Sequence, residues 1–94
     1  MEYVWKRLTV DTLISDSFTL LSCVVITPSD TKKGDITIYN GESASDEHVI
    51  KIRTPSSASW ELRFEPSLIL DRGLYVDVGG DVEDVLVQYL IGKP

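Results

Sequence analysis

Hydrophobic and polar residues alternate along much of the chain, which is the pattern of a half-buried β-strand. In residues 60–65 every second position is apolar and the positions between are charged: Trp60, Glu61, Leu62, Arg63, Phe64 and Glu65. Residues 49–54 and 74–78 repeat the alternation. Successive side chains of a strand point to opposite faces, so each segment has one inward face. We expect the core to contain Ile50, Ile52, Trp60, Leu62, Phe64, Leu74, Val76 and Val87.

Two other segments are apolar on both faces. Residues 18–26 set one row of side chains (Leu20, Ser22, Val24 and Ile26) against another (Leu21, Cys23 and Val25), and residues 85–91 are interrupted only by Gln88. A strand that is apolar on both sides needs cover on both sides. In a small sandwich the opposite sheet provides one cover, and we expect a neighbouring subunit to provide the other.

Turn residues separate these segments at short intervals. Asn40-Gly41 is a strong turn dipeptide, and glycine or proline lies between most of the other segments. Several short strands at this spacing predict an all-β fold, namely an antiparallel β-sandwich, jelly-roll-like or Ig-like, of seven to eight strands. Residues 11–17 fit either a short strand or an irregular connection. We expect one domain over residues 1–94, with residues 1–10 as a possible N-terminal strand or arm.

The length of 94 residues leaves little margin of stability for a single core. Small domains often gain stability from disulfides, metals or partner subunits, and Cys23 is the only cysteine, so no disulfide can form within the chain. We therefore expect self-association as a homo-oligomer, with a closed ring as the favoured form.

The net charge of −6 disfavours nucleic acid and anionic membrane surfaces as partners. The first residues lack the layout of a signal peptide, and the longest apolar stretch, around residues 20–26, is too short to span a bilayer. These features predict a soluble protein made in a cytoplasm, where a single unpaired cysteine is unremarkable in redox terms.

No group of residues in the sequence has the spacing of a catalytic or metal site. His48 follows Asp46 and Glu47, but three consecutive residues of an extended segment point to alternate sides, so an exposed segment before a strand is the better interpretation. No G-x-S-x-G sequence frames a serine. Cys23 lies within an apolar strand, where cysteine behaves as a small hydrophobic residue.

The acidic run near Gly79-Gly80 also has a simple interpretation. Its members are Asp77, Asp81, Glu83 and Asp84. Their spacing departs from that of a calcium-binding loop, so we interpret them mainly as a solvated turn, with a weak calcium site as the alternative. The sequence thus predicts no enzyme, no cofactor and no metal.

An aromatic and basic cluster opens the chain, where Tyr3, Trp5 and Arg7 alternate and Lys6 lies between the last two. Tyrosine, tryptophan and arginine are the usual anchors of protein interfaces, so an interface is the first interpretation. An ordinary edge strand and a ligand platform remain the alternatives. We take Tyr3, Trp5 and Arg7 as the candidate interface residues.

Residues 24–90 resemble short β-sandwich proteins encoded among the virion genes of tailed phages. The shared features are the segments 26–28, 34–41 and 49–53, then Phe64-Glu65-Pro66, the Gly-Leu-Tyr-Val sequence of residues 73–76, and a last strand that ends in Tyr89. In those proteins a Tyr-x-Gly turn precedes a variable loop, as Tyr39-Asn40-Gly41 does here.

The resemblance implies an oligomeric protein that is virion-associated or a host-derived prophage protein. We expect it in the host cytoplasm during assembly and then in the virion. It assigns no catalytic or ligand residues. The leading hypothesis is a non-enzymatic structural or capsid-decorating phage protein that contacts copies of itself and other virion proteins. The alternative is a small-ligand or carbohydrate-binding sandwich that uses Trp5, Tyr39, Trp60 or Tyr75.

Overall fold

The computed structural model describes residues 3–29 and 32–92, so Met1 and Glu2 of the predicted arm and Asp30 of the predicted turn lie outside it. The described residues form eight strands and no helix: β1 (Val4–Leu8), β2 (Thr12–Ser15), β3 (Thr19–Pro28), β4 (Asp35–Asn40), β5 (Glu47–Arg53), β6 (Trp60–Leu70), β7 (Leu74–Val78) and β8 (Val82–Ile91). Among them there is consequently no helix of the length and hydropathy needed to cross a membrane. The uncertain segment 11–17 contains a strand, β2.

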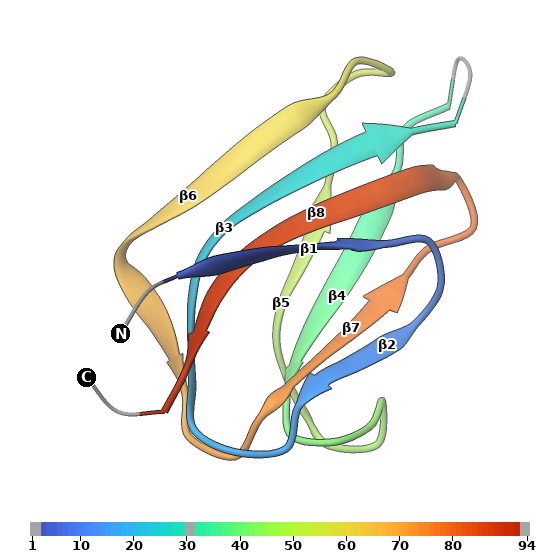
Figure 1. The fold of residues 1–94 in the computed structure, drawn as a ribbon. Coiled ribbons are helices and arrows are strands. Elements are labelled where there is room, and N and C mark those ends of the chain that lie inside the picture. The colour runs from blue at the N-terminus through green and yellow to red at the C-terminus, as the bar shows by residue number, and fades with distance from the viewer. Residues whose placement is uncertain (1–2, 30–31, 93–94) are drawn as a thin grey trace.

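The strands form two antiparallel sheets that pack face to face (Figure 1). Sheet A has the order β1-β8-β3-β6 and sheet B the order β2-β7-β4-β5. The sequence prediction of an antiparallel β-sandwich is therefore confirmed. The first strand pairs with the last, the second with the seventh, the third with the sixth and the fourth with the fifth. This nested pairing is that of a jelly roll, which selects between the two predicted sandwich types.

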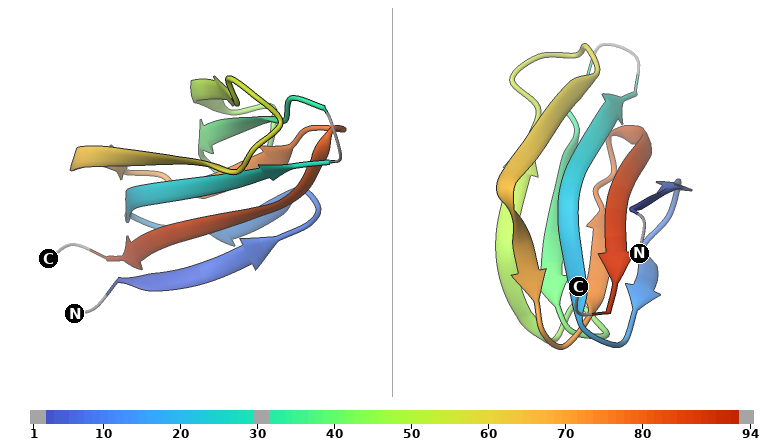
Figure 2. Two further views of the ribbon diagram at one scale, coloured as in Figure 1. Left: turned by 90° about the horizontal axis from the view of Figure 1, so that it is seen from above. Right: turned by 60° about the vertical axis from the view of Figure 1, so that its left-hand side comes forward.

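The core lies between the two sheets, whose separation is visible when the molecule is turned (Figure 2). Sheet B contributes mainly isoleucine, leucine and valine from β4 and β7, and sheet A contributes the same residue types from β3 and β8. The fully buried side chains include Leu21, Val24, Ile26, Ile36, Ile38, Leu70, Leu74, Val76, Val85 and Val87. Branched aliphatic side chains suit this position because they pack well on a pleated surface.

The predicted core residues fall into two groups. Ile52, Leu74, Val76 and Val87 are buried. Ile50, Trp60, Leu62 and Phe64 pack against the core but remain only partly buried. The physical reason is that β5 and β6 are the edge strands on one side of the sandwich, so solvent reaches their side chains from that side.

A β-bulge interrupts β3 at Ser22. The pairing of β3 with both β6 and β8 shifts between Leu21 and Cys23. The extra residue places Leu21 on the inward face with Val24 and Ile26, whereas Leu20 and Cys23 face away from sheet B. The simple alternation predicted across residues 18–26 is therefore wrong before the bulge and correct after it.

Gly73 lies where the connection to β7 crosses the end of β2. Its φ of 143° belongs to a region that residues with a side chain rarely adopt. A Cβ built on Gly73 would lie 2.9 Å from the carbonyl oxygen of Gly41 and closer still to that of Ser15. Gly73 thus allows three backbone segments to meet at this end of the sandwich.

Candidate interaction surface

The surface with most exposed anchor residues is the side of sheet A that faces away from sheet B, called here the outer face. Two rows of paired residues cross it from β1 through β8 and β3 to β6. The first row is Arg7, Leu86, Val25 and Glu61, and the second is Trp5, Gln88, Cys23 and Arg63. The adjacent row, which runs from Leu8 on β1 to Trp60 on β6, packs in the core. Successive side chains of a strand alternate, so the Arg7–Glu61 row beside it points outward.

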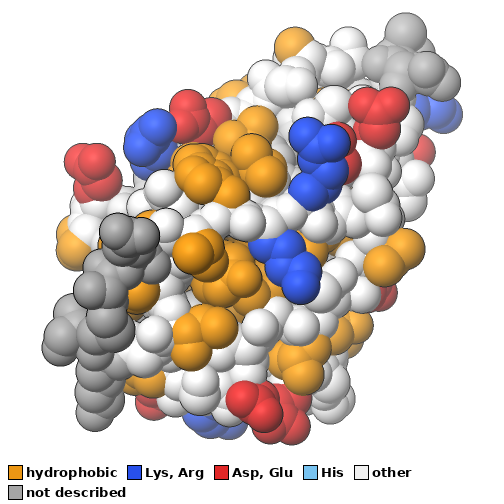
Figure 3. Space-filling view, in the orientation of Figure 1, with side chains coloured by type: hydrophobic (Ala, Val, Ile, Leu, Met, Phe, Trp, Pro, Cys, Tyr) orange, Lys and Arg blue, Asp and Glu red, His pale blue; other side chains and the backbone are white. Residues whose placement is uncertain are grey.

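The middle of the outer face is apolar. Leu20 and Val25 on β3 and Leu86 on β8 are half-buried although sheet B lies on the opposite side. Figure 3 shows apolar side chains gathered across the strands of sheet A, with lysine and arginine side chains next to them. The second apolar face that the sequence predicts for β3 and β8 is therefore present. The exposed Trp5 and Ile69 and several charged side chains flank it.

Trp5 and Arg7 lie at the β1 edge of this face. Trp5 is 46% exposed, a large fraction for a tryptophan side chain. Arg7 extends into solvent, with its Nε 4.0 Å from the Asp84 carboxylate on β8. Their alternation with Lys6 and Leu8 places them together on the outer face, as the sequence predicts.

Tyr3 immediately precedes β1, and its position differs from that of the other two candidates. Its hydroxyl lies 3.1 Å from the hydroxyl of Ser67 on β6, the opposite edge strand of sheet A. Tyr3 thus reaches across the outer face and covers the end where Leu20 and Leu90 pair. Tyr3 is still 39% exposed, so all three members of the predicted set are accessible.

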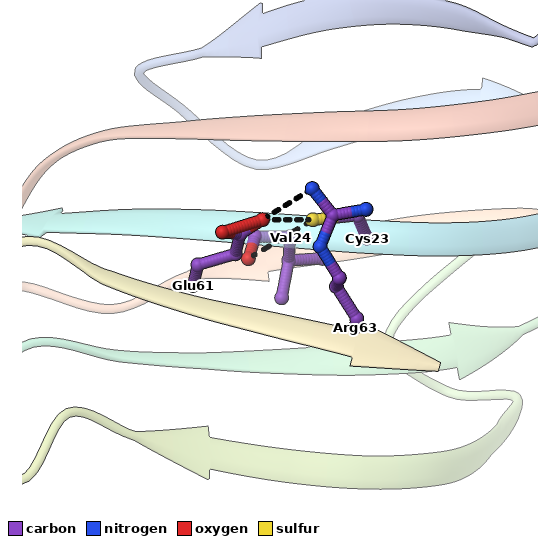
Figure 4. Close-up of polar contacts among 4 residues, drawn as sticks. All are labelled: Cys23, Val24, Glu61 and Arg63. Atoms are coloured by element: carbon purple, nitrogen blue, oxygen red, sulfur yellow. Dashed lines mark hydrogen bonds and ion pairs between the residues drawn. The ribbon is translucent and has the colours of Figure 1, made fainter. Parts of the chain in front are cut away.

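Cys23 lies on the outer face but is not accessible. Its side chain is fully buried beneath Glu61 and Arg63, whose side chains form an ion pair with Nη2 2.9 Å from Oε1 (Figure 4). The thiol contacts the same Glu61 oxygen at 3.6 Å. Burial, then the negative charge of Glu61 and the hydrogen bond to it, raise the pKa of the thiol, and Arg63 opposes this shift. The burial of the side chain and the raised pKa of the thiol together keep Cys23 in the unreactive thiol form.

The opposite surface, the solvent side of sheet B, brings together residues that the sequence leaves apart. Tyr39 on β4 and Tyr75 on β7 meet edge to face, with ring centroids 6.0 Å apart.

Beside the two tyrosines, Asp77 lies close to Asp11, whose carboxylate accepts a 2.8 Å hydrogen bond from the backbone N–H of Val78. Desolvation and the adjacent Asp11 raise the pKa of the Asp77 carboxyl, with a smaller contribution from Asp35, while Lys51 lowers it. The sequence interpretation of Asp77 as part of a solvated turn is therefore wrong, because Asp77 lies within β7 beside Asp11.

Replacing Asp77 with asparagine is expected to stabilise the protein at about pH 7 more than at about pH 3. The raised pKa means that the folded protein binds the proton of Asp77 more tightly than the unfolded chain does. Stability from this group therefore falls as pH rises from the ordinary aspartate value through the raised one, and the deficit persists at neutral pH. Asparagine keeps a donor for Asp11 without the charge.

Thermal melts at both pH values test this expectation, with the exposed Asp16→Asn as the control for loss of one negative charge. An Asp77→Asn protein whose melting temperature rises no more at neutral than at acidic pH would contradict it.

The remaining candidates do not converge. His48 lies within β5 opposite Tyr39 rather than in a loop before the strand. The described residues contain no group of three or more His, Cys, Asp or Glu side chains placed to hold a metal ion. Of the four aromatic residues considered for a ligand platform, Trp60 packs against the core, Trp5 lies on sheet A, and Tyr39 and Tyr75 lie on sheet B. The surface formed by residues 3–29 and 32–92 has no pocket.

Comparison with known proteins gives no relative from which a function could be inferred, so the geometry of the outer face is the main evidence for one. No known protein family matches the sequence, and no curated protein matches it.

Proposed function

We propose that this protein is a non-enzymatic assembly module that works by self-association, and that it serves as a structural or capsid-decorating protein of a tailed-phage virion. The observation that carries the self-association is the outer face of sheet A. There an exposed Trp5 and Arg7 border a strip of apolar side chains, which is the composition of an interface core with its anchors.

The assignment to a phage virion rests on the likeness of residues 24–90 to short virion-encoded sandwiches. The jelly roll is compatible with it but does not select it, because viral capsid proteins, lectins and cupins share this fold. A gene neighbourhood that contains portal, capsid or tail genes is the expected finding. Neighbours that are all metabolic genes would count against the virion assignment and leave the self-association intact.

Replacing Trp5 with alanine is expected to weaken self-association by about 2 kcal/mol or more, roughly 30-fold in the dissociation constant, as for an interface hot spot. The fold should remain intact because Trp5 lies outside the core. Sedimentation velocity over a dilution series measures this, with circular dichroism as the check on folding.

Leu13→Ala is the matched control. Leu13 is 44% exposed, nearly the same fraction as Trp5, but it lies on β2 in sheet B. If Trp5→Ala and Leu13→Ala weaken association equally, the outer face of sheet A is not the interface. A parent protein that sediments as a monomer at every concentration would contradict the proposed function itself.

A further inference from the structure

The two edges of sheet A are complementary to each other. β1 and β6 are the edge strands, and each pairs with a single neighbour, β8 and β3 respectively. Because all pairs in the sheet are antiparallel, β1 and β6 run in opposite directions. A second copy placed beside the first can therefore set its β1 against β6 and continue the antiparallel sheet.

The rows across the sheet define how these edges match. Arg7 and Glu61 are the two ends of one row, and Trp5 and Arg63 are the two ends of the next. When one copy is shifted across the sheet without sliding along the strands, each row continues into the next copy. Arg7 then meets Glu61, an opposite charge, and Trp5 meets Arg63, a cation on an aromatic ring.

A slide of two residues destroys this complementarity. In one direction it places Arg7 opposite Arg63, and like charges directly opposite each other destabilise a pair of strands. In the other direction Arg7 faces Ser59 and loses its ion pair. The charges therefore favour one register among those that keep the two outer faces on the same side.

The inward-facing side chains of the same edges support the same register. It pairs Val4, which is 49% exposed, with the half-buried Phe64, and Leu8 with the half-buried Trp60. The whole of β1 then lies along the first half of β6. Lys6 comes opposite Leu62, where its aliphatic stem can cover apolar surface while the ammonium group stays in water.

We infer that copies of this protein associate head to tail, with β1 of one copy adding to the β6 edge of the next so that Arg7 pairs with Glu61 and Trp5 with Arg63. This inference rests on the proposed self-association and specifies the contact made at the β1 edge, where Trp5 and Arg7 lie; the apolar strip on β3 and β8 stays outside this edge contact. The contact is heterologous, so it repeats from copy to copy and closes into a ring when the rotation between neighbours divides a full turn. A twofold pairing of two β6 strands would leave Trp5 and Val4 exposed.

Disulfide trapping between two single-cysteine variants tests the contact. Directly opposite residues of antiparallel strands have Cα atoms about 4.5–5.5 Å apart, which is within the range of a disulfide. Arg7→Cys and Glu61→Cys proteins are each oxidised alone and then as a mixture. Both variants also carry Cys23→Ala, because Glu61 covers the native thiol and its replacement would uncover it. A covalent dimer that forms in the mixture and not in either protein alone is the expected result.

Three outcomes are informative in other ways. A disulfide between Glu61→Cys and Arg63→Cys chains would show a twofold β6 contact and overturn the inference. An oligomer that persists without any Arg7–Glu61 cross-link would overturn the inference but not the proposed function. A monomer under all conditions would overturn both.

Charge reversal provides an independent measurement. Arg7→Glu is expected to raise the dissociation constant at least ~10-fold, since it sets like charges opposite each other across the contact. Arg53→Glu, an exposed residue on β5 in sheet B, is the matched control and should change it little. Equal effects of the two variants would mean that net charge, and not the β1–β6 contact, controls association.

Discussion

Replacing Gly73 with alanine should lower the free energy of unfolding by about 2–6 kcal/mol, from the combined costs of a strained backbone and a steric overlap. The φ of 143° is unfavourable for alanine, and the new methyl group would overlap the carbonyl oxygens of Ser15 and Gly41. Both oxygens belong to backbone that cannot move without disturbing the strands they border. A domain of this size has only about 5–15 kcal/mol in total.

Gly80→Ala is the matched control, because a Cβ on Gly80 meets nothing within 4 Å. Denaturant unfolding of the parent and both variants gives the comparison. A loss for Gly73→Ala no larger than that for Gly80→Ala would show that the crossing at Gly73 can relax, contrary to this expectation.

Replacing Leu21 with alanine should cost about 2–5 kcal/mol, the usual range for a leucine truncated in a core. Leu21 is fully buried and lies at the bulge, between β6 and β8, where its neighbours come from three strands of one sheet and from the sheet opposite. The strands around it are held by backbone pairing on both sides, so the cavity can collapse only in part. Thermal and denaturant unfolding measure the loss.

The control carries the same substitution on the surface. Leu13→Ala removes the same atoms from a residue that is 44% exposed. Comparable losses for the two variants would mean that Leu21 does not face the core, and the register before the bulge would need revision. Phe64→Ala, at a half-buried edge position, should fall between them.

The sequence was most informative where a strand has one polar face. In residues 60–65, 49–53 and 74–78 the alternation predicts the inward side chains correctly, because a one-residue slip would move charged residues into the core. In β3 both faces are apolar, so nothing in the composition marks Ser22 as the extra residue of a bulge relative to β8. The pattern also does not distinguish an edge strand from a central one, which is why Trp60 and Phe64 are less buried than predicted.

The strand pairing could not be predicted from local patterns. Alternation tells which way a side chain points and not which strand lies beside it, and the nested order pairs segments from opposite ends of the chain. The same limit applies to the surface. Trp5 and Arg7 could be placed on one face from their spacing, whereas the contact of Tyr3 with Ser67 joins residues 64 positions apart. The proximity of Asp11 to Asp77 is likewise a product of the tertiary fold.

The nested pairing has a consequence for the order of folding. β4 and β5 enclose only residues 41–46, so their hairpin closes at the smallest entropic cost. Once it exists, β3 with β6 and β2 with β7 each extend a structure whose ends are already close, and β1 with β8 completes it. We expect β1 to dock last. Since β1 holds Trp5 and Arg7, a chain that has not finished folding cannot present them, so the proposed self-association would select completed subunits.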